Sequence, residues 1–451
     1  MSLTPHDPEE FDDNLPPVTA IEAQVRVLRG RRVAKVVSGF IFGQGAAQGM
    51  SVLAGLFLVR KLSVEAYAQF GLASGFQTVF SVLMDLGFAS TIIPLVGDRR
   101  DDPALIGRYV RSAKHLRDRS FWLLAPVAAI AFLAIVHRHH WSWTVQLLLL
   151  GSVLVSLYSV GKVAYFSAPL FVFGRLREYY VPQVVTGAVR VLAYVGLAFA
   201  GSLNAWTAAG LIALTFTFNA SFIQRASRKL LTWPTRDDPA TDREMVKYIL
   251  PASPAIIFSA FQSQISLFLV GIFGGTINIA EVTALSRIGQ LFALLLTFHV
   301  VVTEPYIARQ PRAGLMRTFA LFLLAGTIAS VPAVLIAFVW PQVFIFIIGG
   351  KYEAIRGLMG WYVLSCCMNL VAGLMWIMNR ARKWVFWSGS IVEVGLVLGT
   401  QLVFLALVGV HTTQQAVHLA VASSFCYLAA HGYVTVYGFW KGDRRIAAAT
   451  A

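Results

Sequence analysis

Three cations and several carboxamides lie in stretches of the sequence that are otherwise apolar. Arg190, Arg287 and Lys162 are such cations, and Gln44 and Gln48 lie in the run GFIFGQGAAQGMSVLAGLFLV. The guanidinium fork of arginine suits phosphate or carboxylate, and a carboxamide both donates and accepts hydrogen bonds. This combination predicts a polar, positively charged site for an anionic ligand.

The surrounding elements must be membrane helices. The chain has 451 residues, of which 57% are hydrophobic and only 13% are charged, whereas soluble domains carry about 25% charged residues. A membrane span needs about 20 mostly apolar residues. Twelve segments meet this requirement: 36–59, 66–95, 120–136, 144–170, 179–200, 204–223, 249–272, 280–303, 318–340, 355–378, 385–409 and 415–438.

The basic residues predict the orientation of these spans, because cytoplasmic loops are enriched in Lys and Arg. The two termini and every second loop together hold twenty-nine basic residues, and the opposite set of loops holds five. Both termini of this multi-pass membrane protein are therefore expected in the cytoplasm. The net charge of +15 follows from this topology, so it does not predict nucleic-acid binding.

The predicted spans form two sets of six. LFLV occurs at Leu56–Val59 and again at Leu267–Val270, and the same offset carries Pro94 onto Pro305. Because six is even, the two halves are expected to have the same orientation. The predicted units are a cytoplasmic tail with an interfacial amphipathic helix (1–35), an N-terminal lobe (36–223), a cytoplasmic linker (224–248), a C-terminal lobe (249–438) and a second tail (439–451).

Polar stripes recur at corresponding places in the two halves. Gln44 and Gln48 share a helix face with Ser51 and Gly55, and the first helix of the second half carries Gln262 in the corresponding stripe. The second spans of the two halves add Gln77 in one, and Arg287 with Gln290 in the other. Lipid offers these groups no hydrogen-bond partner, so they predict either a central wet cavity or polar contacts between helices.

The three cations are the strongest candidates for the site, because inserting each one costs roughly 2.5–3.5 kcal/mol. Arg190 follows Tyr179 by eleven residues, which places it about 16 Å along the helix and near the midplane. An alternative is an ion pair between Arg190 and Glu393, and Lys162 could instead extend its amine toward the membrane surface. The predicted substrate-binding residues are Arg287, Arg190, Lys162, Gln44, Gln48, Gln77, Gln262 and Gln290.

Carboxylates within the spans are candidates for coupling to protons or sodium. Glu393 and Asp85 are the residues we expect to serve this role. Asp85 and Glu304 lie near the cytoplasmic ends of their spans, where helix capping or pairing with nearby arginines is the alternative. Two copies of RDDPA, at 100–104 and 236–240, indicate helix starts with Asp as cap and Pro in the first turn. No nucleotide-binding, metal or catalytic pattern is present, so we expect no cofactor, no metal and no enzymatic activity.

The segment Phe57 to Pro94, FLVRKLSVEAYAQFGLASGFQTVFSVLMDLGFASTIIP, resembles the first helical pair of polysaccharide-repeat (O-antigen type, Wzx-like) flippases of the MOP exporter superfamily. The matching residues are Arg60, Leu62, Ser63, Glu65, Tyr67, Asp85, Leu86 and Gly87. The glycine that usually follows the tyrosine is Ala68 here. The resemblance implies an all-α polytopic fold with twelve transmembrane helices in two six-helix bundles around a central cavity, as in MATE exporters.

The resemblance also implies a location, the bacterial inner membrane, and a function. Members of this family translocate undecaprenyl-diphosphate-linked oligosaccharide units from the cytoplasmic to the periplasmic leaflet by alternating access, for exopolysaccharide, O-antigen or capsule biosynthesis. The expected partners are this lipid-linked oligosaccharide, membrane lipids, and the polymerase and glycosyltransferases of the same pathway. A MATE-like cation-coupled exporter of small molecules is the alternative. A membrane glycosyltransferase is disfavoured, because the outward loops are short and carry no acidic catalytic pair.

Overall fold

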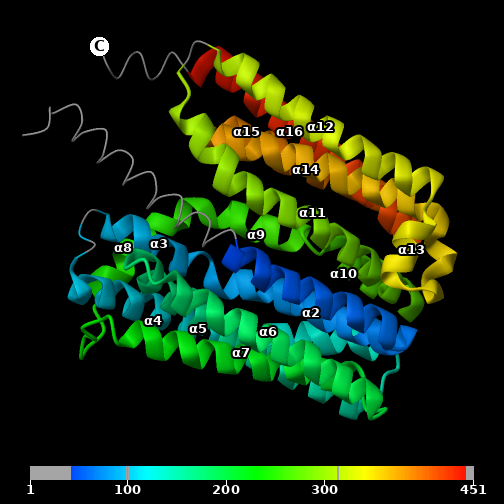
Figure 1. Cartoon of the computed structure of the whole chain (residues 1–451), viewed down its shortest axis with the longest axis horizontal. Helices are drawn as coiled ribbons and strands as arrows, with labels where there is room; N and C mark the ends of the chain where they lie inside the picture. Colours follow the sequence, from blue (N-terminus) through cyan, green and yellow to red (C-terminus); the bar gives the residue numbers. More distant parts are fainter. Residues whose placement is uncertain (1–41, 98, 100, 312–313, 385, 443–451) are drawn as a thin grey trace, which may run out of the picture.

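The computed structural model describes residues 42–97, 99, 101–311, 314–384 and 386–442, and these residues are helical with no strand. The interfacial helix predicted in 18–35 and the start of the first predicted span, 36–41, lie outside the described residues. The first described helix is Phe42–Lys61. The helices that follow it (Figure 1) are α2 (Val64–Asp85), α3 (Phe88–Val96), α4 (Pro103–His137), α5 (Trp143–Val172), α6 (Leu176–Phe199), α7 (Ala205–Arg228), α8 (Pro239–Ile249), α9 (Ser253–Gln262), α10 (Ile265–Phe273), α11 (Thr276–Arg309), α12 (Leu315–Val339), α13 (Gln342–Ile348), α14 (Met359–Ala381), α15 (Trp387–Leu407) and α16 (Thr413–Tyr437).

The predicted multi-pass architecture is confirmed. Ten of the described helices are long and apolar enough to cross a membrane, and two bent pairs raise the number to twelve. The bent pairs are α2 with α3, at 41°, and the helix Pro239–Gln262 with α10, at 54°. Each pair corresponds to one predicted span, 66–95 and 249–272.

The two bends differ in their local sequence and backbone. Between α2 and α3 the backbone turns through Leu86 and Gly87, at φ 43° and 85°, and glycine adopts this left-handed conformation without steric cost. In the seventh span, Pro251 lies in a short 3₁₀ turn, Leu250–Ala252, and Pro254 lies in the first turn of α9. The 54° bend comes later, after Gln262, where the sequence contains no proline.

Capping residues confirm the two helix starts predicted from RDDPA. The Asp102 carboxylate accepts hydrogen bonds from the backbone N–H groups of Ala104 and Leu105, and Pro103 opens α4. Asp238 caps α8 in the same way, with Pro239 in the first turn. Helix α4 therefore begins well before the predicted span 120–136, because its first four turns are too charged to appear as an apolar segment.

The helices pack in two groups, which we call the N-half (Phe42–Lys61 and α2 to α7) and the C-half (α9 to α16). In the N-half α7 packs on α5 and α6, and in the C-half α14 packs on α11, α12 and α16 (Figure 1). The two groups meet where α2 packs on α9, α10 and α11. Helix α8 belongs to the predicted linker and packs on α3 and α4. The exact lobe boundaries stay a prediction.

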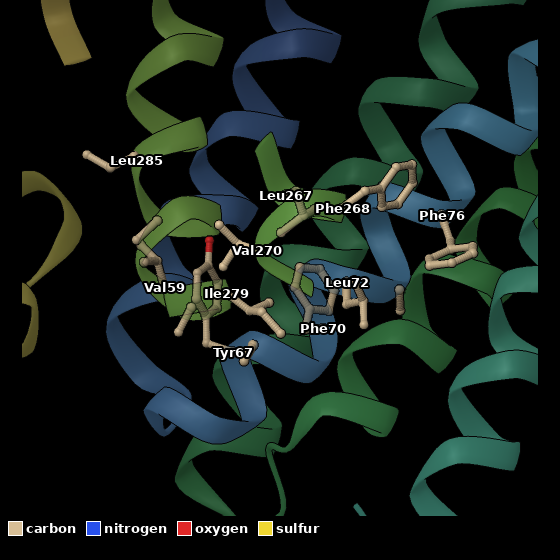
Figure 2. Packing of buried hydrophobic residues seen from close by; sticks show 14 of the residues in the cluster. Val59, Tyr67, Phe70, Leu72, Phe76, Leu267, Phe268, Val270, Ile279 and Leu285 are labelled. Atoms are coloured by element: carbon tan, nitrogen blue, oxygen red, sulfur yellow. The ribbon is translucent and has the colours of Figure 1, made fainter. Parts of the chain in front are cut away.

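One hydrophobic core joins the two halves. Tyr67, Phe70 and Phe76 of α2 lie in it together with Leu267 and Phe268 of α10 (Figure 2). The ring centroids of Phe76 and Phe268 are 5.1 Å apart. Away from this junction the cores separate: a second cluster links α3, α4 and α5 with α8, and a third links α12 with α14 and the end of α11.

Candidate functional site

Three of the predicted site residues line one pocket in the N-half. Gln44 and Gln48 face it from the first helix, and Arg190 faces it from α6. Asn219 of α7 completes its polar wall. The cavity measures about 190 Å³. We call it the N-half pocket; its other lining residues are Ala47, Ser51, Gln183, Thr186, Gly187 and Phe216.

Arg190 is buried in this wall, and no acid among the described residues pairs with it. Its side chain lies 5.8 Å from the ring centroid of Phe216, and the residue is only 8% exposed. Its Nε has no hydrogen-bond partner among the described residues, nor has Oδ1 of Asn219. Buried charges are normally paired. The predicted alternative, an ion pair with Glu393, is wrong, since no ion pair joins these two residues.

Arg287 lies where the two halves meet. Its Nε donates a hydrogen bond to the hydroxyl of Tyr67, 2.9 Å away on α2, and its Nη1 donates to Oε1 of Gln290 at 3.3 Å. The guanidinium also lies 5.8 Å from the ring centroid of Phe70. A Cβ on Gly55 would lie only 3.0 Å from Nη1, so the glycine leaves room for this side chain. No described acid forms an ion pair with Arg287.

A larger pocket lies in the C-half, among α9, α10, α11, α14 and α16. Its volume is about 540 Å³. Of the predicted site residues, Gln262 lines it. More than half of the lining side chains carry a hydroxyl or carboxamide group, and none of these described side chains is Lys, Arg, Asp or Glu. We call this the C-half pocket.

Four of the predicted residues line neither pocket: Arg287 and Gln290, which lie at the junction of the halves, and Lys162 and Gln77. The Nζ of Lys162 lies 4.6 Å from the ring centroid of Tyr158 on the same helix, and Tyr158 is 37% exposed. Gln77 is half-buried on α2. Their predicted roles in substrate binding stay predictions, as does the role of Gln290, which accepts a hydrogen bond from Arg287.

The carboxylates differ in their partners. Asp85 lies 3.9 Å from Nη1 of Arg117, and the Arg117 guanidinium also donates to the carbonyls of Ser81 and Leu157, each at 3.1 Å. Glu304 forms a two-pronged ion pair with Arg380. These contacts match the pairing alternative for both acids. Glu393 has no ion pair among the described residues.

Sequence reasoning missed several polar groups around the pockets. Gln183, Thr186 and Arg190 form a stripe at i, i+3 and i+7 on α6, so the helical spacing could have revealed them. In the C-half, the Asn369 amide donates to Ser424 Oγ at 2.8 Å, and the Gln401 amide donates to Gln262 Oε1 at 2.9 Å. The sequence gives no signal for these pairs, because they depend on how separate helices are rotated against one another.

The fold is shared with solved transporter structures of the MOP superfamily. The lipid II flippase MurJ in an inward closed conformation superposes with a TM-score of 0.63 at 12% identity, over 88% of this chain and 87% of that chain. A MATE in complex with MaD3S gives 0.60 at 15% identity, over 92% and 96%. An inward-facing multidrug resistance MATE family transporter of the MOP superfamily gives 0.59 at 12% identity, over 88% and 94%.

No protein-family model and no curated protein sequence matches the chain. At identities of 12–15% the structural likeness establishes the fold. The predicted fold class is thereby confirmed: the chain is a multi-pass membrane protein with a MATE- and MurJ-like fold. The narrower resemblance to O-antigen type flippases stays a proposal.

Proposed function

We propose that this protein is a flippase that moves undecaprenyl-diphosphate-linked oligosaccharide units from the cytoplasmic to the periplasmic leaflet of the bacterial inner membrane. The observation that carries the proposal is the pair of arginines, Arg190 and Arg287, within membrane-spanning helices and without an acidic partner among the described residues. A diphosphate would supply the missing negative charge and accept hydrogen bonds from both guanidinium groups.

The positions of the arginines support a ligand that engages both halves. Arg190 lies in the wall of the N-half pocket, and Arg287 lies at the contact between α2 and α11. A head group held by both residues would respond to any motion between the halves, as alternating access requires. While the head group is bound, the polyprenyl chain would stay in the lipid bilayer, against the apolar outer surfaces of the helices.

The contacts between the halves support a gate at the predicted periplasmic end. The Arg60 guanidinium donates to the carbonyls of Phe346 and Ile347, the latter at 3.1 Å, and the Lys351 amine donates to the carbonyl of Leu62. Arg60 also lies 4.9 Å from the ring centroid of Phe346. Release of substrate to the outer leaflet would require these contacts to break.

The alternative is a MATE-like exporter of small molecules, coupled to a cation. The shared fold does not separate the two functions, and the unpaired Glu393 is the feature that favours coupling. Uncompensated arginines oppose a cationic substrate, because like charges repel within a medium of low dielectric constant. If the protein is a flippase, its expected partners include the polymerase and the glycosyltransferases of the same glycan pathway.

A translocation assay tests the proposal. The purified protein is reconstituted in liposomes with a fluorescent lipid-diphosphate oligosaccharide, and the leaflet distribution is followed with a membrane-impermeant quencher. We expect rapid equilibration with the wild type and at least about tenfold slower translocation for Arg287→Gln and Arg190→Gln, from the loss of charge-assisted hydrogen bonds. The matched control is Arg138→Gln, an exposed arginine outside both pockets.

Two results would contradict the proposal. Efflux of cationic dyes without lipid translocation would favour the exporter. Normal translocation by both arginine variants would refute the role assigned to Arg190 and Arg287.

A further inference from the structure

The C-half pocket differs in chemistry from the arginine site beside it. A hydroxyl or carboxamide can donate and accept hydrogen bonds at once, and most of the pocket's polar side chains are of these two kinds. Its described lining carries no charge, although Arg287 lies on one of its helices. Such a surface suits a ligand that is polar, uncharged and rich in hydroxyl groups.

The polar groups retain free hydrogen-bonding capacity. The Asn369 amide nitrogen is engaged by Ser424, but no described residue engages Oδ1 of Asn369. Oε1 of Gln262 accepts a hydrogen bond from Gln401, while its own amide nitrogen has no partner among the described residues. In each of these two carboxamides one polar atom is thus held by a neighbouring side chain, and the other is available to a ligand.

Aromatic rings complete the pocket. Tyr362, Tyr427 and Phe292 line it from three different helices. The flat face of an aromatic ring packs well against the C–H face of a sugar ring, and the hydroxyl of a tyrosine can hydrogen-bond to a hydroxyl group of the sugar. The pocket has a volume of about 540 Å³. This volume lies within the range of about 300–1,000 Å³ typical of small-molecule sites.

The pocket adjoins the proposed diphosphate site along α11. Ser286 lines the pocket and is followed directly by Arg287. Gln290 holds Arg287 from the same helix, one residue after Gly289, which lines the pocket. A ligand whose sugar is joined to a diphosphate could therefore place the two groups in the two sites at once.

We propose that the C-half pocket binds the glycan of the transported lipid, and that the sugars it receives are uncharged. This inference rests on the flippase function proposed above. The arginines hold the diphosphate, while Gln262, Asn369 and the aromatic rings hold the first sugars. Sugars that carry a carboxylate are disfavoured, because an ionised group buried without a partner is costly.

Binding measurements with three lipids test this assignment. The probes are a short-chain polyprenyl diphosphate without sugar, the same lipid with a neutral oligosaccharide, and the same lipid with a uronic acid in the first position. In detergent micelles we expect the wild type to bind the neutral glycolipid at least about tenfold more tightly than the acidic one.

Variants locate the effect in the pocket. Gln262→Leu and Asn369→Leu should each weaken the neutral glycolipid by about three- to tenfold, from one or two lost hydrogen bonds. Both variants should bind the sugar-free diphosphate as the wild type does, which also shows that they are folded. The matched control is Gln342→Leu, at an exposed position of α13 outside both pockets.

The outcomes separate the two proposals. The glycan assignment would be overturned if the pocket variants bound the neutral glycolipid as tightly as the wild type, or if the wild type bound the acidic glycolipid more tightly than the neutral one. Neither result would contradict the flippase proposal. Failure of the wild type to bind any lipid diphosphate would refute the flippase, and the glycan assignment with it.

Discussion

The two pockets of this protein divide its polar chemistry between the two halves. The N-half pocket is small, about 190 Å³, and contains the buried cation Arg190. The C-half pocket is larger, about 540 Å³, and its described lining is uncharged. The two pocket linings therefore differ in electrostatic character. The difference indicates that one ligand with a charged part and a neutral part would fit both pockets better than two copies of one group.

The largest effect on translocation is expected from a cross-link between the halves, because alternating access requires the two halves to move against each other. Arg60 and Lys351 both reach across the junction at the predicted periplasmic end. Joining Arg60→Cys and Lys351→Cys with a short cleavable thiol reagent should abolish translocation. Cleaving the reagent should restore it, and the uncross-linked variant is the control. Undiminished translocation in the cross-linked protein would show that this junction is not a gate.

A second prediction contrasts two buried arginines of the N-half. Arg117 is 3% exposed and paired with Asp85, and Gly161 leaves the space it fills, since a Cβ there would lie 2.0 Å from its Nε. Arg117→Met should lower the free energy of unfolding by about 1–3 kcal/mol, because the half-buried Asp85 loses its partner and the carbonyls of Ser81 and Leu157 lose their donor. Arg190→Met removes an unpaired charge and should cost far less.

Chemical unfolding in detergent micelles measures this difference. The double variant Arg117→Met with Asp85→Leu should recover most of the stability, as a hydrophobic replacement of a buried ion pair does. If Arg190→Met destabilised the protein as much as Arg117→Met, Arg190 would be a structural residue and the contrast between the pockets would lose its basis.

The smallest effect concerns the loop that precedes α8. Arg111 on α4 donates hydrogen bonds to Asp237, at 2.5 Å, and to the carbonyl of Pro234. The bond from Arg111 holds the pKa of Asp237 below its ordinary value of 3.8. The Asp237 side chain is 48% exposed, so Asp237→Asn should cost only about 0.2–1 kcal/mol of unfolding free energy.

The pH dependence of this contact has a defined sign. A lowered pKa in the folded state means that the contribution is fully present above the ordinary aspartate pKa and disappears as the pH falls through the folded value. The wild type and Asp237→Asn should therefore differ at pH 7 and converge as the pH falls below the ordinary aspartate pKa and through the lower folded value. A difference that persisted or grew in acid would exclude this ion pair as its cause.

The sequence predicted the spans well and the site in part. An apolar segment long enough to cross a bilayer has few possible structures other than a membrane helix. Composition alone also located the two bent spans. Arg190, Gln44 and Gln48 were predicted site residues because polar groups inside apolar helices require a partner. They line one pocket, and their role in binding stays a prediction. The Gln262 and Asn369 networks escaped prediction, since each joins helices whose relative rotation depends on packing across the whole C-half.

The pairing of acids shows the same limit. The position of Asp85 at the end of α2 suggested either coupling or an ion pair, but only the long charged start of α4 brings Arg117 beside it. Counted along their predicted spans, Glu393 and Arg190 lie at comparable depths in the membrane, yet they form no ion pair. Depth along a helix can be counted from the sequence, whereas the direction a side chain takes around the helix bundle cannot.

Affinity for a sugar-free polyprenyl diphosphate tests the central claim most directly, because it isolates the arginines from the glycan. A titration in detergent micelles would compare the wild type with Arg190→Gln, Arg287→Gln and the control Arg138→Gln. We predict roughly tenfold to hundredfold weaker binding for the first two variants, the loss expected for charged hydrogen bonds, and no change for the control. Equal affinity across all four proteins would contradict the claim that these unpaired arginines form an anion-binding site.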